Sequence, residues 1–300
     1  KRGKFIQSLP WLMQYLSNCR QSKVRDTSNK LTTLLSLVDE GYEDLFNDAD
    51  IENLISRESI FYVWSNKLFY NSARKDFETR EKTGVKIEII SKNEINDVEP
   101  NINNIFYKGA LFKGSYFAKN PKKISEKLLQ LFIEKGGNFK KEKIDEIKIL
   151  DTNKVNIHTN ENTYTYDRIV LCAGVWSKKL TDKLGENIPL ASERGYHLMY
   201  PHPENSISRP IAWQERGVYF TPMQDGLRAG GVVELGGNSS EISSKVVSYL
   251  KRATEAVFPN INNHLSEWVG FRPSVPDSLP VIGQSKKNPY IYYCFGPQHI

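Results

Sequence analysis

An uninterrupted apolar run that ends in two small residues constrains the fold of this chain more than any other feature. Residues 169–172 are all apolar and lead directly into Ala173 and Gly174, and a helical pattern follows over residues 180–184. A strand that is apolar at every position is typical of a parallel sheet with both faces covered. The run therefore predicts a buried parallel strand of an α/β sheet, a tight corner and a helix.

Most of the remaining strand signals are antiparallel. Apolar and polar residues alternate from Lys148 to Tyr166, which predicts a β-meander. Ser65 and Asn66 are all that separate two short strand-like runs, which predicts a hairpin. The two runs of this hairpin are residues 60–64 and 67–70. Further strands are predicted at residues 218–220, 227–235, 268–273 and 290–295.

Four segments have the apolar periodicity of amphipathic helices. They are residues 9–16, 31–46, 121–135 and 243–257. Ser8 is the expected N-cap of the first helix. Gly41 is expected to break the second helix, and Gly136 is expected to end the third.

The net charge of +6 comes mainly from one lysine-rich segment. Residues 101–150 contain 11 lysines against 5 acidic residues, and no arginine. Nucleic-acid interfaces usually combine lysine with arginine and aromatic side chains. The segment therefore predicts a solvated surface and no nucleic acid partner, although a peripheral membrane or nucleic-acid binding module stays open as an alternative.

The positions of cysteine and the absence of several motifs exclude common chemistries. Cys19, Cys172 and Cys294 are far apart, which indicates neither a zinc site nor a disulfide framework and fits a reducing compartment. No metal is expected. The sequence contains no G-x-S-x-G, H-E-x-x-H or P-loop motif, so hydrolase and kinase functions have no support.

An aromatic segment near the start of the chain has two interpretations. Residues 5–19 are uncharged, but they are too few and too polar to cross a bilayer. Leu9, Met13 and Leu16 recur at helical spacing, and basic residues flank the segment. An interfacial membrane helix has this pattern, and so does a surface helix that packs its apolar face on the core.

Four segments, the first of which contains the apolar run described above, follow one another along the chain. They are residues 169–177, 193–197, 219–236 and 270–283, and the last begins Gly270-Phe271-Arg272-Pro273. In order and spacing they resemble the D-amino-acid oxidase superfamily of flavoproteins, and most closely its D-amino-acid dehydrogenases. The resemblance covers residues 111–300 well and the preceding residues weakly.

The resemblance implies a mixed α/β (α+β) fold. An incomplete Rossmann-like FAD-binding lobe is expected to be interleaved with an antiparallel-sheet substrate lobe. The expected division is a helical segment at 1–50, a substrate-binding lobe at 51–120 and 186–277, and a partial FAD-binding lobe at 121–185 and 278–300. The family's phosphate-binding G-x-G-x-x-G is absent, as expected of a fragment without the first βαβ unit.

The resemblance also implies two catalytic-site residues. Arg272 is expected to hold the substrate carboxylate, because a guanidinium forms two parallel hydrogen bonds to such a group. An ion pair with Glu267 or Asp277 is its structural alternative. Tyr219 begins a strand that faces the same cavity in the family, and its alternative is a position in the core or at the rim.

FAD is the cofactor that the resemblance implies. The backbone near Gly174 is expected to approach the adenosine half of FAD. The residues expected to contact FAD are Ile144, Ala173, Gly174, Trp176, Gly283 and Gly296. Tyr196 and His197 are weaker site candidates. Pro297 departs from the family pattern and removes a backbone donor, which alters the expected pocket.

The predicted function is that of an FAD-dependent D-amino-acid dehydrogenase. Hydride passes from Cα to flavin N5, and the products are a 2-oxo acid and ammonia. A glycine- or sarcosine-type amine oxidase, or a non-catalytic flavoprotein subunit, is the alternative. The expected partners are a small amino-acid substrate and, by analogy, a membrane electron acceptor, which places the protein in the cytoplasm, peripheral on the cytoplasmic membrane.

Overall fold

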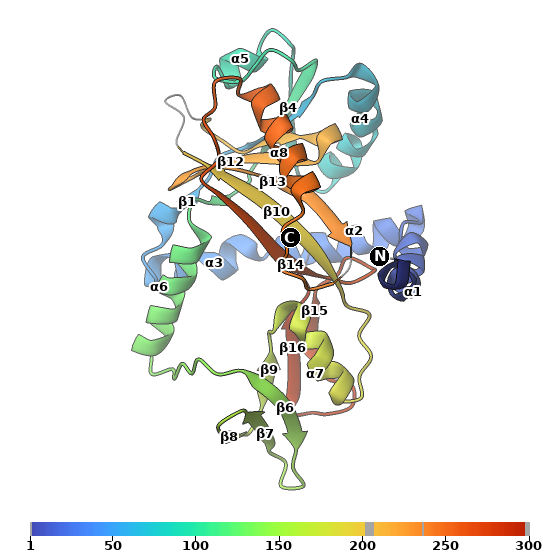
Figure 1. Ribbon diagram of the computed structural model, residues 1–300, viewed down its shortest axis with the longest axis vertical. Helices are drawn as coiled ribbons and strands as arrows, with labels where there is room; N and C mark the ends of the chain where they lie inside the picture. The colour runs from blue at the N-terminus through green and yellow to red at the C-terminus, as the bar shows by residue number, and fades with distance from the viewer. Residues whose placement is uncertain (1, 202–206, 236, 298–300) are drawn as a thin grey trace.

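An eight-stranded sheet forms the larger part of the computed structural model, which describes residues 2–201, 207–235 and 237–297 (Figure 1). Its strand order is β14-β10-β13-β12-β11-β2-β4-β3. All neighbours are antiparallel except β11 and β2, which are parallel. The strands are β2 (Ile60–Trp64), β3 (Lys86–Ile90), β4 (Lys108–Lys113), β10 (Ala191–Tyr200), β11 (Ile211–Trp213), β12 (Val218–Met223), β13 (Gly226–Leu235) and β14 (Ser266–Ser274).

One face of this sheet is covered by the helix α8 (Ser244–Val257), which lies across β10 and β13 in Figure 1. Leu250 and Val257 of the helix are fully buried in one core with Leu198 and Phe220 of the sheet. Successive residues of a strand point to opposite faces. The residues between these core positions therefore point to the other face.

That other face has three positions without a side chain. Gly195 on β10 is paired with Gly270 on β14, and Gly230 on β13 is paired with His197 on β10. Directly paired residues of an antiparallel sheet share a face. We call this side of the sheet, opposite α8, the glycine face.

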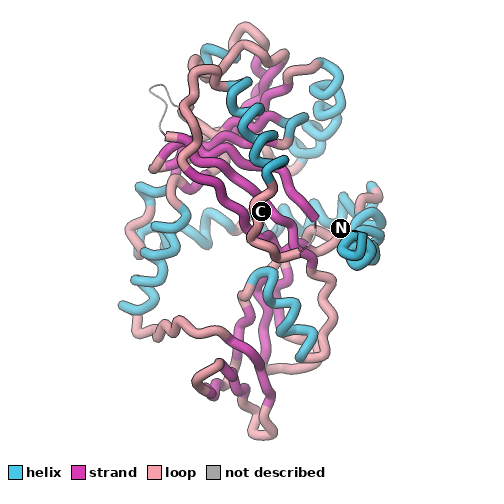
Figure 2. The backbone as a smooth tube through the Cα atoms, in the orientation of Figure 1, coloured by secondary structure: helices cyan, strands magenta, loops and turns pink. Residues whose placement is uncertain are grey.

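Two small sheets lie together at the other end of the molecule, below the large sheet in Figure 2. The first has the order β15-β16-β9, and β9 is parallel to β16. The second is the meander β6-β7-β8. Their elements are β6 (Ile144–Ile149), β7 (Val155–Thr159), β8 (Thr163–Tyr166), β9 (Ile169–Leu171), η2 (Gly174–Trp176), α7 (Ser177–Lys183), β15 (Val281–Gln284) and β16 (Ile291–Phe295). Leu171, Leu180 and Tyr293 join them in one core.

The first helices run beside both parts. They are α1 (Arg2–Asn18), α2 (Gln21–Leu35) and α3 (Val38–Asp48), followed by η1 (Glu52–Leu54) and by β1 (Ile55–Ser56), which pairs with β5 (Phe117–Ala118). Phe46 and Leu54 form a small core against Leu128 of α6 (Pro121–Glu134). No helix of the described ranges is long and apolar enough to span a bilayer.

The parallel strand, the meander and the helices α6 and α8 are confirmed. Gly136 follows α6 with φ +91°, as the expected glycine stop requires. The fold class is also confirmed, since the elements form a mixed α/β structure. The strand β9 is, however, covered on one side only, because Val170 is 60% exposed.

The predicted hairpin after Trp64 is wrong. Residues 67–70 begin the helix α4 (Lys67–Lys82) instead. The reason is Asn66, whose side chain accepts a hydrogen bond of 2.7 Å from the Leu68 N–H. An asparagine at this position is a strong helix N-cap. Residues 67–70 therefore form the first turn of a helix, although their aromatic side chains favour a strand.

The predicted boundaries of the first two helices are also wrong. α1 begins at Arg2, so that Ser8 lies within the helix and does not cap it. The chain breaks at Ser36 and Leu37, between α2 and α3, and Gly41 lies inside α3. The Ser36 hydroxyl donates to the Thr33 carbonyl oxygen, a local hydrogen bond that competes with continued helix. The short elements not yet given are α5 (Ile95–Val98) and η3 (Gln214–Arg216).

Candidate functional site

The glycine face gathers the polar and aromatic side chains that could act on a small molecule. Arg272 lies opposite Glu193, and His197 lies opposite both Trp268 and Gly230. Tyr219 lies opposite Gly230 from the other side. These pairings place all five side chains on one face of four neighbouring strands.

The glycines create the room in which two of these side chains lie flat. A Cβ atom on Gly195 would lie 2.9 Å from an Arg272 terminal nitrogen and 3.0 Å from its guanidinium carbon. A Cβ atom on Gly270 would lie 1.9 Å from the Trp268 ring. The Arg272 guanidinium therefore lies across Gly195, and the Trp268 ring lies across Gly270.

Arg272 does not form the structural ion pair that was its alternative. Glu267 accepts from His264 at 3.1 Å, and an Asp277 carboxylate oxygen accepts from the Leu279 N–H at 3.1 Å. None of the ion pairs between described residues includes Arg272. A half-buried guanidinium that forms no ion pair with a described residue is suited to an anionic ligand.

His197 is a neutral group on this face. Burial and, as a smaller cause, the charge of Arg228 together lower its pKa to about 4. The ring is stacked on Trp268 with 4.7 Å between centroids and 19° between planes. At neutral pH the imidazole therefore carries no charge and can both donate and accept a hydrogen bond.

Tyr219 shares the face but not the immediate surroundings of Arg272. Two strands, β10 and β13, lie between β14 and β12, so the two backbones are about 14 Å apart at a spacing of about 4.8 Å per strand. The Tyr219 side chain is 42% exposed, which fits a position at the rim. Burial raises the pKa of Tyr62 on the nearby strand β2, and the neighbouring Tyr219 acts in the same direction as a smaller cause.

The residues expected to contact FAD fall into two groups. Trp176 packs edge-to-face on Phe271, with 6.1 Å between centroids, and a Cβ atom on Gly296 would lie 3.7 Å from the Pro273 carbonyl oxygen. These two residues therefore adjoin the Arg272 segment. Ile144 begins β6 in the meander, and Gly283 lies on β15.

The backbone at two of these positions fits close contact with a nucleotide. Gly174 follows the parallel strand β9 and has φ +55°, and Gly283 has φ +139°. A Cβ atom on either glycine would meet no atom within 4 Å. Open space in front of a glycine that follows a parallel strand, as at Gly174, is the arrangement in which backbone approaches a dinucleotide, whereas Gly283 lies within the antiparallel strand β15.

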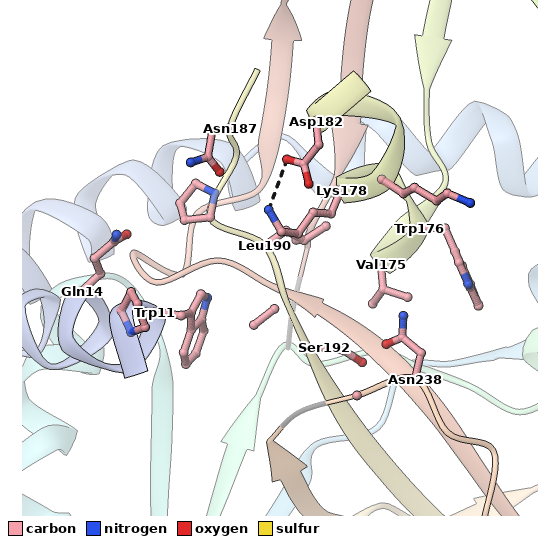
Figure 3. A pocket seen from close by; sticks show the side chains of 15 residues that line it. Trp11, Gln14, Val175, Trp176, Lys178, Asp182, Asn187, Leu190, Ser192 and Asn238 are labelled. Carbon is pink, nitrogen blue, oxygen red and sulfur yellow. Dashed lines mark hydrogen bonds and ion pairs between the residues drawn. The ribbon is translucent and has the colours of Figure 1, made fainter. Parts of the chain in front are cut away.

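A cavity lies where α1 and α7 meet the end of the large sheet, and Figure 3 shows it. It has a volume of about 710 Å³, and its lining includes Trp11 and Gln14 of α1 with Trp176 and Asn238. Trp11 donates to the Ser274 carbonyl oxygen at 3.2 Å, which holds α1 against the end of β14. Of the predicted site residues only Trp176 lines this cavity, so the catalytic candidates lie on the glycine face outside it.

Sequence reasoning missed two members of the site. Trp268 and Arg228 both point to the glycine face, but neither was singled out. The signal for Trp268 is the alternation of its strand, because Trp268, Gly270 and Arg272 are two residues apart and must share a face, whereas Arg228 lies on β13 and is placed only by the strand register. Tyr196, a weaker candidate, points to the opposite face and lies in the core beneath α8.

A family model described as FAD dependent oxidoreductase matches residues 16–299. The chain belongs to this family. The cofactor is accordingly FAD. Among the described residues, no group of three or more His, Cys, Asp or Glu side chains could hold a metal ion.

Individual relatives are more distant. A D-amino-acid oxidase of Bradyrhizobium diazoefficiens is 27% identical over an alignment of 300 positions that covers 98% of this chain and 71% of the relative. A D-amino acid dehydrogenase of Vibrio vulnificus is 24% identical over 95% of this chain and 70% of its own. The glycine oxidase of Geobacillus kaustophilus superposes with a TM-score of 0.78 at 16% identity, covering 88% of this chain and 71% of that chain, which establishes a shared fold.

The neutral state of His197 can be tested by nuclear magnetic resonance. We expect its imidazole signals to stay in the neutral position from pH 8 to pH 5, because the pKa of the ring is lowered to about 4. A His197→Gln variant assigns the signal among the five histidines. A titration midpoint near the ordinary value of about 6.5 would contradict the burial argument.

Proposed function

We propose that the protein oxidises the C–N bond of a D-amino acid to give a 2-oxo acid and ammonia. The observation that carries this proposal is Arg272, a half-buried guanidinium that lies across Gly195 and takes part in no ion pair of the described chain. When bound, FAD supplies the acceptor for the hydride that leaves Cα. Names of the relatives support the substrate class, since two of them are a D-amino-acid oxidase and a D-amino acid dehydrogenase.

The protein's own residues would then position the substrate. Arg272 holds the α-carboxylate by two parallel hydrogen bonds, which fixes the direction of the Cα–H bond. His197 is uncharged and therefore does not repel the cationic amino group of the substrate. Tyr219 lies at the rim, where its hydroxyl can bind the carboxylate or limit the entry of water. After the hydride and a proton leave, water adds to the imino acid and ammonia departs.

We also propose the division of labour between the two parts. Residues 51–120 and 186–277 supply the glycine face and would form the substrate lobe, while 121–185 and 278–300 would form part of the FAD lobe. Supporting this division, β9, β15 and β16 share a core that is separate from that of the large sheet. The helix α6 departs from it, because α6 packs on residues 46–54.

A glycine- or sarcosine-type oxidation is a second candidate. Glycine oxidase of Geobacillus kaustophilus shares the fold, and the glycine face has no side chain at three positions near Arg272. Such a substrate has no side chain to bind. A panel of D-alanine, glycine and sarcosine with an artificial electron acceptor distinguishes the two activities.

Replacing Arg272 by leucine tests the carboxylate anchor. We expect KM for D-alanine to rise about 10- to 100-fold while the flavin spectrum stays unchanged, because a charge-assisted hydrogen bond is lost. Arg252→Leu, at an exposed position of α8, is the matched control. An unchanged KM in the Arg272 variant would remove this residue from the site.

A peripheral association with the cytoplasmic membrane is proposed for the helix α1. Leu9, Met13 and Leu16 are exposed at helical spacing, and Arg20 and Lys23 follow at its end. An apolar row beside basic residues is typical of a helix that lies in an anionic membrane surface. Such a contact would bring the protein to a membrane electron acceptor.

Vesicle sedimentation tests this association. We expect the full-length protein to bind vesicles of anionic phospholipid, more weakly at high salt, and a Met13→Ser, Leu16→Ser variant to lose most of the binding. Leu265→Ser changes a leucine that is equally exposed, far along the chain, and serves as the control. Equal binding by all three proteins would show that α1 is not the membrane contact.

A further inference from the structure

A second arginine points to the glycine face and has no role in the function proposed above. Arg228 lies on β13, opposite Met199 of β10 and Thr221 of β12. Met199 and His197 alternate along β10 on the same face as Gly195. Arg228 is therefore on the side of the sheet that carries Arg272, and it is half-buried there.

No described carboxylate neutralises Arg228. The ion pairs and side-chain hydrogen bonds of the described ranges do not include its guanidinium, and the acids nearest to it in the sequence bond elsewhere: Glu234 with Arg194, and Asp225 with Asn120. Glu193 is the acid of the glycine face, but it lies opposite Arg272 and acts on Tyr15 of α1. A half-buried guanidinium without a carboxylate is costly unless an anion binds it.

The Arg272 guanidinium extends along β10 in the direction of Arg228. Their positions along β10 are six residues apart, Met199 to Glu193, which is about 20 Å at about 3.3 Å per residue. Arg272 covers part of this distance by reaching across Gly195. Burial lowers the pKa of Arg228, and the charge of Arg272 acts in the same direction, in agreement with their position on one face of the sheet.

His197 occupies the register position between them. Its ring is fixed against Trp268, and it feels the charge of Arg228. Two cationic residues, Arg272 and Arg228, thus flank the register position of an uncharged ring. They suit two anionic groups joined by a short chain.

We propose that Arg228 binds a second anionic group of the substrate, so that the protein prefers an amino acid with an acidic side chain. The inference rests on the proposed function, in which Arg272 binds the α-carboxylate. Arg228 would then act as the specificity-determining residue, with His197 and Trp268 beneath the carbon chain that joins the two carboxylates.

The kinetic test compares D-glutamate with D-glutamine, which differ only in the charge of the distal group. In the flavin-loaded full-length protein we expect kcat/KM to be at least tenfold higher for D-glutamate. Arg228→Met should abolish this preference by a loss confined to D-glutamate, and Arg228→Lys should retain part of it because the charge remains. Arg252→Met is the matched control.

A binding measurement separates this inference from the function on which it rests. Titration calorimetry with glutarate and butyrate, neither of which is an amino acid, should show tighter binding of glutarate, lost in Arg228→Met and kept in Arg252→Met. If glutarate binds in this way but no amino acid is oxidised, the proposed function fails and the anion subsite stands. Equal losses for glutarate and butyrate, or no loss for either, in the Arg228→Met variant would overturn the inference.

Discussion

The contact between Arg272 and the bare backbone of Gly195 is the interaction on which the account of this site depends. The guanidinium can lie flat across β10 only because no Cβ atom occupies that position. A long, flexible arginine side chain loses much conformational freedom when it is held, and a flat support reduces the number of orientations it can take. The strand register therefore pre-organises the anchor before any ligand arrives.

The two faces of the large sheet carry different kinds of residue. One face is filled by side chains that pack under α8, with Leu250 and Phe220 fully buried. The other face has glycine where side chains would meet Arg272, Trp268 or His197. The sheet is thus a rigid support on one side and a binding surface on the other, an arrangement in which packing and function do not compete for the same residues.

Local patterns predicted much of this fold, and their failures have physical causes. The continuous apolar run before Gly174 predicted the parallel strand, and alternation predicted β12, β13 and β14, because these signals depend on burial alone. The hairpin after Trp64 failed because one capping side chain, Asn66, determines the helix α4. Arg272 was found from its motif, but Arg228 requires the register of three strands, which no local pattern contains.

The affinity of a Gly195→Ala variant for a carboxylate ligand tests the central claim most directly. The three atoms nearest to the added methyl group all belong to the end of the long Arg272 side chain, so stability should change little while the guanidinium is displaced. We expect butyrate to bind the flavin-loaded variant at least tenfold more weakly, and Gly41→Ala, where a Cβ atom meets nothing within 4 Å, to bind it normally. Unchanged affinity in Gly195→Ala, with the protein folded, would contradict the account.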